Sequence, residues 1–583
     1  MVFLPRDRSQ QSAVATLSST RIRPNAYDLA AFALLLAAAV LLSHGAGEMR
    51  NPLSVLSVQP VTLDVGHLPE YALRTTLRMF AAMLASLLFT FTVATLAAKS
   101  RRAEMVIVPA LDILQSVPVL GFLSFTVTFF MNLFPGSQFG AECASIFAIF
   151  TAQAWNMAFS FYQSLRTVPR DLDEVSRGYG FSAWQRFWRL EAPFAAPGLI
   201  WNMMMSMSGS WFFVVASEAI TVGNTTVTLP GIGSYLALAI ERKDMAAVGW
   251  AVVAMGVVIL LYDQLLFRPI VTWADKFRFE QTASSDKPRS WVYDLVHRAH
   301  LLKRLSAPFA WGWQRLMLVR FGFPQRIRAR VPFKRNLVSD RFWLAFVLAL
   351  AAWCAWIAFD YVRQTLSWAD LREAFGSGLA TLLRVVVLIA IASLIWVPIG
   401  VWVGLRPRVA QRVQPIAQFL AAFPANVLFP VAVVAIVATG ANPNIWLSPL
   451  MVLGTQWYIL FNVIAGASAF PTDLREAATV YELRSWTWWR RVILPGIFPY
   501  YVTGALTASG GSWNASIVAE IAQWGDKHVE AYGLGSYIAK ATTAGDFHRV
   551  VLGIAVMSLF VTLFNRVVWR PLYVYAERRL RVD

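Results

Sequence analysis

Residues 471–495 read PTDLREAATVYELRSWTWWRRVILP, a polar stretch between two long apolar runs. A related stretch, PRDLDEVSRGYGFSAWQRFWRLEAP, occupies residues 169–193, which is 302 residues earlier. In each copy, four residues fall at helical spacing on one face: Leu172, Val175, Ser176 and Tyr179 in the first, and Leu474, Ala477, Ala478 and Tyr481 in the second. The stretch is too polar to cross a membrane, so it predicts a short helix whose small-residue face docks into a partner.

The repeat extends far beyond these two stretches. At the offset of 302, the matches include Trp155 with Trp457, Pro193 with Pro495, Trp211 with Trp513, Glu218 with Glu520, and Gly-x-Gly-Ser-Tyr at 231–235 with the same motif at 533–537. Nearer the start of each copy the offset is 306, as in Thr75 with Thr381, Arg78 with Arg384 and Pro118 with Pro424. The chain is therefore an internal duplication, and repeats of this kind dictate the fold.

The composition is that of a membrane protein. Of 583 residues, 57% are hydrophobic and 14% are charged, whereas ordinary soluble domains carry about 25% charge. About 20 apolar residues are needed for a helix to span the bilayer core. We predict an all-α polytopic membrane protein with about twelve such spans, near residues 28–46, 72–98, 107–133, 142–164, 194–219, 246–267, 342–361, 377–404, 413–439, 445–469, 496–520 and 549–569.

The charge distribution predicts the orientation of these spans. If the N-terminus is cytoplasmic, 40 of the 51 Lys and Arg residues lie on the inner side, as the positive-inside rule requires. The net charge of +18 then needs no nucleic acid to explain it. Both termini are predicted to be cytoplasmic, and two six-span halves cross in the same sense, as parallel repeats with a pathway between them.

The predicted domains are a first repeat at 1–268, a basic connector at 269–340 and a second repeat at 341–583. The connector is rich in aromatic and basic residues, which favours amphipathic helices on the anionic inner leaflet; a flexible basic linker is the alternative. The first span could also be a secretory signal, since Arg21 and Arg23 precede it. A corresponding span at 342–361, in the middle of the chain, favours a retained helix instead.

The doubled stretch resembles the signature of the permease subunits of binding-protein-dependent ABC importers: Glu-Ala-Ala, three residues, Gly, nine residues, Ile, one residue, Leu-Pro. The second copy keeps Glu476, Ala477 and Ala478 but has Glu482 where the family has Gly, while the first keeps Glu174 and Gly180. The run GSWNASIVAE at 511–520 further resembles the nitrate, sulfonate, taurine and bicarbonate branch in its duplicated-permease form.

This resemblance implies an ATP-driven importer subunit in the bacterial inner (plasma) membrane, serving a small solute, with an anion expected. No P-loop motif occurs, so ATP and Mg are expected on two copies of a partner ATPase, with a periplasmic solute-binding protein above and no cofactor in this chain. The implied ATPase-coupling residues are Asp173, Glu174, Val175, Ser176, Gly180, Asp473, Glu476, Ala477, Ala478 and Glu482.

An anion would need neutral donors inside the membrane, because no Lys or Arg lies near the middle of a span. The expected translocation-pathway residues are Gln153, Trp155, Asn156, Ser206, Ser208, Ser210, Glu218, Gln456, Trp457, Ser512, Asn514, Ser516 and Glu520. Some of these hydroxyls are expected to serve helix packing instead. Arg78 and Arg384, near the outer ends of their spans, are expected either to attract anions or to snorkel to the headgroups.

Other classes of protein receive less support from the sequence. The two cysteines and six histidines lack the spacing of a metal site, and no clustered nucleophile or acid/base set indicates an enzyme. An ion-coupled secondary transporter with duplicated six-helix halves stays open as the alternative, but it would need ionisable relays deep in the spans.

Overall fold

The computed structural model describes residues 25–48, 61–116, 121, 123–222, 225–277, 290–320, 337–423, 425–468, 470 and 472–579. The predicted connector segments 278–289 and 321–336 and the paired prolines Pro118 and Pro424 lie outside these ranges. The chain forms two compact units, whose boundaries cut across the repeats. One comprises 1–44, 168–197 and 263–327, and the other 45–167, 198–262 and 328–583.

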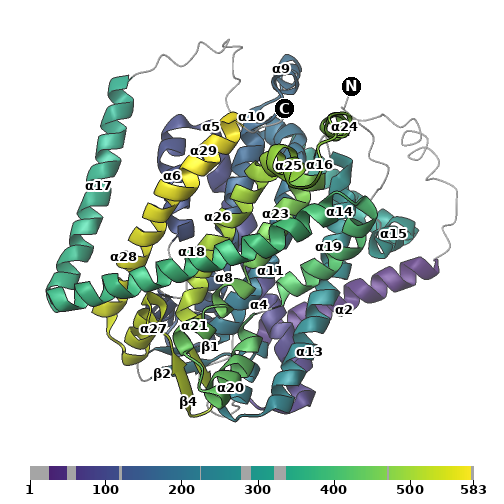
Figure 1. Ribbon diagram of the computed structural model, residues 1–583. Helices are drawn as coiled ribbons and strands as arrows, with labels where there is room; N and C mark the ends of the chain where they lie inside the picture. The colour runs from purple at the N-terminus through teal and green to yellow at the C-terminus, as the bar shows by residue number, and fades with distance from the viewer. Residues whose placement is uncertain are drawn as a thin grey trace. The chain divides into compact units, whose positions relative to one another are not determined.

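The duplication is visible as two series of elements in the same order (Figure 1). The first repeat consists of α4 (Leu68–Phe89), η2 (Thr90–Ala94), α5 (Thr95–Lys99), α6 (Arg101–Ser116), α7 (Leu123–Leu133), α8 (Gln138–Arg166), α9 (Arg170–Gly178), α10 (Ala183–Arg186), η4 (Phe187–Glu191), α11 (Ala192–Glu218), β1 (Ala219–Val222), β2 (Thr225–Thr228), α12 (Ile232–Glu241), α13 (Met245–Tyr262), η5 (Asp263–Phe267) and α14 (Arg268–Ala274).

The second series matches the first nearly element by element. It consists of α18 (Trp368–Gly404), α19 (Pro407–Ala422), η7 (Ala425–Leu428), α20 (Phe429–Thr439), α21 (Pro443–Trp446), α22 (Leu450–Leu453), α23 (Gln456–Ser468), α24 (Thr472–Val480), α25 (Ser485–Trp488), η8 (Trp489–Ile493), α26 (Leu494–Ala519), β3 (Ile521–Trp524), β4 (Lys527–Glu530), α27 (Leu534–Ala544), α28 (Phe547–Phe564), η9 (Asn565–Trp569) and α29 (Arg570–Arg579). The all-helical duplicated architecture is confirmed.

The remaining helices precede one series or the other, or lie between the two. They are α2 (Ala26–Glu48), the short η1 (Val65–His67), η6 (Asp275–Phe277), α15 (Trp291–Arg298), α16 (His300–Leu318) and α17 (Leu337–Arg363). The apolar window of α17 is not buried at all within the protein, which is the arrangement expected of a helix that faces lipid.

Membrane-spanning length is reached by fewer helices than the twelve predicted spans. Seven helices in the described part are long and apolar enough to cross, or eight if one bent pair is a single span. In the described part of the predicted span 107–133, α6 ends at Ser116 and α7 begins at Leu123, and the predicted span 413–439 contains α19, η7 and α20 as separate elements. Pro430, at the start of α20, removes a backbone donor and favours a helix start there.

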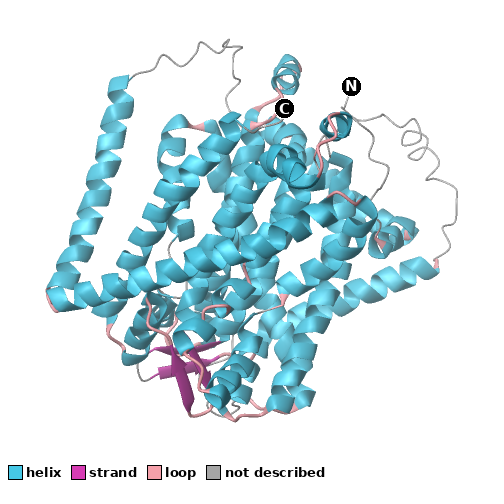
Figure 2. Ribbon diagram, viewed as in Figure 1, coloured by secondary structure: helices cyan, strands magenta, loops and turns pink. Residues whose placement is uncertain are grey.

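Two β-hairpins, which the sequence did not predict, interrupt the helices at corresponding places (Figure 2, magenta). β1 pairs antiparallel with β2, and β3 with β4, directly after α11 and α26. β3 packs on α12 of the first repeat and β1 packs on α27 of the second. Across this contact, the Gly525 N–H donates to Ile240 O at 3.0 Å and Lys243 pairs with Asp526 at 2.6 Å. The hairpins therefore hold the two repeats together.

Candidate functional site

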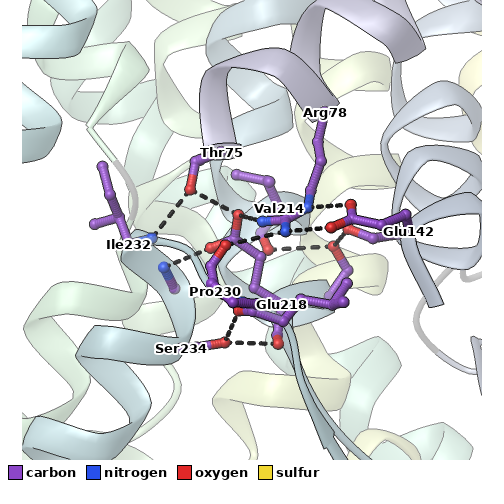
Figure 3. Close-up of polar contacts among 12 residues, drawn as sticks. Thr75, Arg78, Glu142, Val214, Glu218, Pro230, Ile232 and Ser234 are labelled. Carbon is purple, nitrogen blue, oxygen red and sulfur yellow. Dashed lines mark hydrogen bonds and ion pairs between the residues drawn. The ribbon is translucent and has the colours of Figure 1, made fainter. Parts of the chain in front are cut away.

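The side chain of Glu218, the last residue of α11, lies in a buried ionic cluster (Figure 3). Arg78 from α4 donates through Nη1 to Glu218 Oε1 at 2.6 Å, and through Nε and Nη2 to the two oxygens of Glu142 on α8, at 2.5 and 2.7 Å. All three side chains have no exposed surface. Arg78 Nη2 also donates to Pro230 O at 3.0 Å. One guanidinium thus ties together α4, α8, α11 and the loop after β2.

The Gly-x-Gly-Ser motif forms a cradle for the Glu218 carboxylate. The Gly233 N–H and the Thr75 hydroxyl donate to it at 2.6 and 2.7 Å, and the Ile232 N–H donates to Thr75 Oγ1 at 3.0 Å. A Cβ on Gly231 would overlap the carboxylate, and one on Gly233 would lie 2.7 Å from the Val215 backbone. Glycine is therefore required by the close approach of backbone to carboxylate.

The second repeat builds the same cluster with one charge fewer. Glu520 accepts from Thr381 Oγ1 at 2.8 Å, from Arg384 Nη1 at 2.9 Å and from the Gly535 N–H at 2.8 Å. In the place of Glu142, 302 residues on, stands Asn444, whose Oδ1 accepts from Arg384 Nη2 at 3.0 Å. The first cluster holds two carboxylates and one guanidinium, whereas this one holds a single carboxylate and a single guanidinium.

The expectation that Arg78 attracts anions or snorkels to the headgroups is wrong, because its side chain is fully buried and engaged on every side. Arg384 is 12% exposed and likewise engaged. The sequence signal was available: an Arg and a Glu inside apolar spans need one another, because an unpaired charge there is costly. Glu142, which begins its predicted span, was the missed partner. Whether Glu218 and Glu520 also act in transport stays a prediction.

The predicted docking helices exist as α9 and α24, each described within its own unit. In α9, Glu174 and Val175 are exposed, whereas Ser176 is buried and its hydroxyl donates to Asp173 O at 2.7 Å. Its equivalent Ala478 is also buried. The surface free for a partner therefore passes through Val175 in the first copy, and in the second through Glu476 and the half-buried Ala477. The side chain of Asp473 lies outside what the structure describes.

Both docking helices end in the same left-handed turn. Gly180 has φ 67° and Glu482, where the family signature has Gly, has φ 49°. The Phe181 N–H donates to Ser176 O at 3.2 Å, and the Leu483 N–H donates to Ala478 O at 2.9 Å, as in a Schellman cap. Left-handed backbone costs a non-glycine residue about 1–2 kcal/mol, so the second helix end is strained at Glu482.

The predicted pathway residues divide into buried and accessible groups. Five are fully or almost fully buried in helix packing: Gln153, Ser206, Ser210, Ser512 and Ser516. Three of the hydroxyls donate hydrogen bonds to backbone carbonyls of their own helix, as Ser210 does to Ser206 O at 2.6 Å. Serines that pack between helices behave in this way. Half-buried members are Trp155, Asn156, Ser208, Gln456 and Trp457. The Asn514 amide, 7% exposed, donates to Gly510 O at 3.4 Å.

The half-buried residues carry the more accessible polar side-chain groups. Gln456 Oε1 accepts from the Trp396 indole at 2.9 Å, and Trp396 packs on Trp457 at 5.2 Å between ring centroids. The Trp155 indole N–H is buried without an acceptor among the described residues. Tyr458, which the sequence analysis missed, places its hydroxyl against Gly209 of the other repeat. Within the described residues no His, Cys, Asp and Glu group could hold a metal ion.

Comparison with known proteins shows which family the sequence matches. A family described as "Binding-protein-dependent transport system inner membrane component" matches twice, at residues 81–268 and 396–582, which together exceed half of the chain. The two matches follow the two series of elements described above.

Individual relatives are more distant, and each covers about a third of the chain. The chain is 29% identical over 195 residues to the bicarbonate transport system permease protein CmpB of Synechococcus elongatus, which is 33% of this chain and 66% of that protein. It is 28% identical over 189 residues to the nitrate import permease protein NrtB of Leptolyngbya laminosa, 32% of this chain and 64% of that protein. The glycine betaine/proline betaine transport system permease protein ProW of Escherichia coli is 27% identical over 168 residues, 29% of this chain and 43% of that protein.

Proposed function

The chain belongs to the family of binding-protein-dependent transport system inner membrane components, and from this membership we propose that it is the membrane subunit of an ATP-driven importer of a small anion. The observation that carries the proposal is the doubled family match, with one docking helix in each copy. The relatives named for bicarbonate and nitrate transport support an anion of that size. The matched stretch spans less than two thirds of each of these relatives.

In this proposal one chain supplies both halves of the pathway. Two copies of an ATPase bind α9 and α24, and a periplasmic solute-binding protein delivers the anion on the opposite side. In the second copy, α26 follows the docking helix α24 and ends at the Glu520 cluster, and its 26 residues extend about 39 Å, enough to cross a bilayer core. A movement imposed at α24 thus reaches the hairpin and cluster of that copy through α26.

The buried cluster gives the second candidate its only specific support. An Arg with two Glu side chains inside the protein is the kind of group an ion-coupled secondary transporter uses as a relay. Its members are, however, fixed by hydrogen bonds on every side, and the second repeat keeps the arrangement with one carboxylate fewer. This favours a structural clamp over a relay.

The test is uptake by reconstituted proteoliposomes that contain this chain, a candidate ABC ATPase and a candidate solute-binding protein. Labelled bicarbonate, nitrate and an alkyl sulfonate would be compared, each with ATP or with an imposed proton gradient. We expect uptake of one anion with ATP alone. Uptake driven by the proton gradient without ATP would show that the protein is a secondary transporter. Failure of the ATPase to co-purify would exclude the importer assignment.

The placement of the pathway is tested in the same vesicles by the Asn514→Leu variant, with Ser210→Ala, whose buried hydroxyl donates to a carbonyl of its own helix, as the control. Loss of the amide at 514 should lower anion uptake while ATP hydrolysis and assembly persist, because neutral donors select the anion inside the membrane. Transport by Asn514→Leu at the wild-type rate would place the pathway elsewhere.

A further inference from the structure

The connector helix α16 is amphipathic and almost wholly exposed. Leu301, Leu305, Phe309 and Leu316 follow one stripe along it, because they are spaced by four, four and seven residues. Phe309 is 85% exposed and Leu305 57%. Apolar side chains exposed to this degree in one stripe indicate a surface that something else covers.

The ends of two apolar helices hold α16 in place, and the end of a third packs on the preceding helix α15, all within one compact unit. The first turn of α2 supplies Asp28, which accepts from the Leu301 N–H at 2.7 Å and caps the helix. Trp184 and Gln185, at the start of the membrane-spanning helix Ala183–Glu218, donate to Leu316 O and Leu318 O at 2.9 and 2.7 Å.

The third end is that of the spanning helix Met245–Ala274, whose last turns, α14, pack against α15, the short helix before α16. Lys276 lies over the Tyr293 ring there, at 5.3 Å. The ends of membrane-spanning helices lie at the boundary between lipid and water. Since α16 is bound directly to the start of Ala183–Glu218, and its neighbour α15 packs on the end of Met245–Ala274, α16 lies at that boundary as well.

The charges of the segment identify what covers the stripe. Between Leu295 and Arg320 the chain contains no Asp or Glu, and its basic residues include Arg304 and Arg315. By helical spacing, both arginines lie on the flank of the apolar stripe, and Arg315 stacks on Trp311 at 4.8 Å. Apolar stripe, flanking cations and interfacial tryptophan together match an anionic lipid surface.

We propose that α16 lies in the plane of an anionic leaflet, with Leu305, Phe309 and Leu316 inserted below the headgroups, and that it anchors the first docking helix to the membrane. The link to the docking helix is direct. The helix α10, held by α16 through Trp184 and Gln185, carries Arg186, which pairs with Asp173 of α9 at 3.3 Å. Trp188 further packs on Trp313 at 5.2 Å.

Among the described residues, only the first copy has this anchor. The equivalent of Asp173 is Arg475 and that of Arg186 is Trp488, so the ion pair has no counterpart in the second copy. Trp486, the equivalent of Trp184, is 68% exposed. The two docking helices therefore differ in how they are held. The inference rests on the membrane location of the family and does not depend on which solute is carried.

The test measures where the stripe lies. In the full-length protein with Cys143 and Cys354 replaced by Ala, Phe309→Cys is labelled with an environment-sensitive fluorophore, and Lys303→Cys, on the opposite side of α16, is the matched control. Both are placed in vesicles of phosphatidylcholine with phosphatidylglycerol as about one lipid in three. Quenching by a nitroxide on the lipid chains is compared with quenching by aqueous iodide.

We expect the label at 309 to be quenched by the lipid nitroxide and shielded from iodide, with the reverse at 303. Replacing Arg304 and Arg315 by Gln should lower the equilibrium constant for insertion of this stripe by about fivefold per arginine, read from the fraction of label at 309 that the lipid nitroxide quenches. Equal access of iodide to both positions would overturn the proposal. So would shielding at 309 that arises only when the ATPase subunit is added, because a protein would then be the occupant.

Discussion

Replacing Arg78 by Gln is the perturbation with the largest expected effect on stability. Arg78 makes two hydrogen bonds to Glu142, one to Glu218 and one to Pro230 O, all without exposure to solvent. Its loss leaves two carboxylates buried side by side without a cation. Removing one partner of a buried ion pair costs about 3–5 kcal/mol, and two stranded carboxylates place this variant at the upper end.

Two further variants separate the ionic effect from lost packing. Arg384→Gln should cost less, about 1–3 kcal/mol, because one carboxylate loses a cation and that carboxylate, Glu520, keeps its hydroxyl and backbone donors. Glu142→Asn copies the natural arrangement at Asn444 and should cost about 1–2 kcal/mol, since an acceptor for the guanidinium remains.

The assay is thermal unfolding of the full-length protein in detergent, followed by fluorescence-detected size exclusion. The expected order of melting temperature is wild type, Glu142→Asn, Arg384→Gln and then Arg78→Gln. Adding Glu142→Gln to Arg78→Gln should recover part of the loss, because one stranded carboxylate disappears. If the double variant melts below Arg78→Gln alone, or if Arg78→Gln melts with the wild type, the ionic reasoning is refuted.

Three more predictions concern the docking helices and the contact between the repeats. Glu482→Gly should raise the free energy of unfolding by about 1 kcal/mol and Gly180→Ala should lower it by a similar amount, both read from melting temperatures, because both positions have positive φ; opposite signs would contradict the strain. Ala477→Arg should reduce co-purification of the ATPase and ATP-driven uptake, since a packed docking surface tolerates no added bulk; unchanged co-purification and uptake would move the docking site. The Lys243 ammonium holds the pKa of Asp526 below its ordinary value near 3.8, so the stability that the pair adds is present at neutral pH and is lost as the pH falls through that lowered pKa. The difference in melting temperature between wild type and Asp526→Asn should therefore vanish in acid, and a difference that grows there would refute the ion pair.

The sequence predicted those features that are repeated within the chain. The offset of 302 predicted matching docking helices, and α9 and α24 are both present with equivalent ends. It also marked Gly231 and Gly233 as special, but the reason lies in the Glu218 carboxylate, which only the fold brings against them. Local pattern records that a residue is constrained; it does not record by what.

Long-range pairing was beyond the sequence analysis for a physical reason. Arg78 is 64 residues from Glu142 and 140 from Glu218. The sequence signals that a charge inside an apolar span needs a partner, but at this separation it does not say which carboxylate is that partner. The breaks within the predicted spans 107–133 and 413–439 were missed because mean hydropathy is insensitive to where the backbone bends. The hairpins were missed because β1 and β3 are only four residues long.

The widened helical turns record the order of events in the ancestry of the chain. η4 and η8 are π-helical turns 302 residues apart, and so are η5 and η9. A π-turn arises from one inserted residue and is costly to keep without a use, so its presence at the same place in both copies dates it to the single ancestral gene. The π-turn η2, inside the first helix of repeat one, has no equivalent in the unbroken α18, so the two copies diverged there after the duplication. Ancestral reconstruction of a one-copy homodimer should therefore retain the paired turns, and whether it retains η2 would show which copy changed.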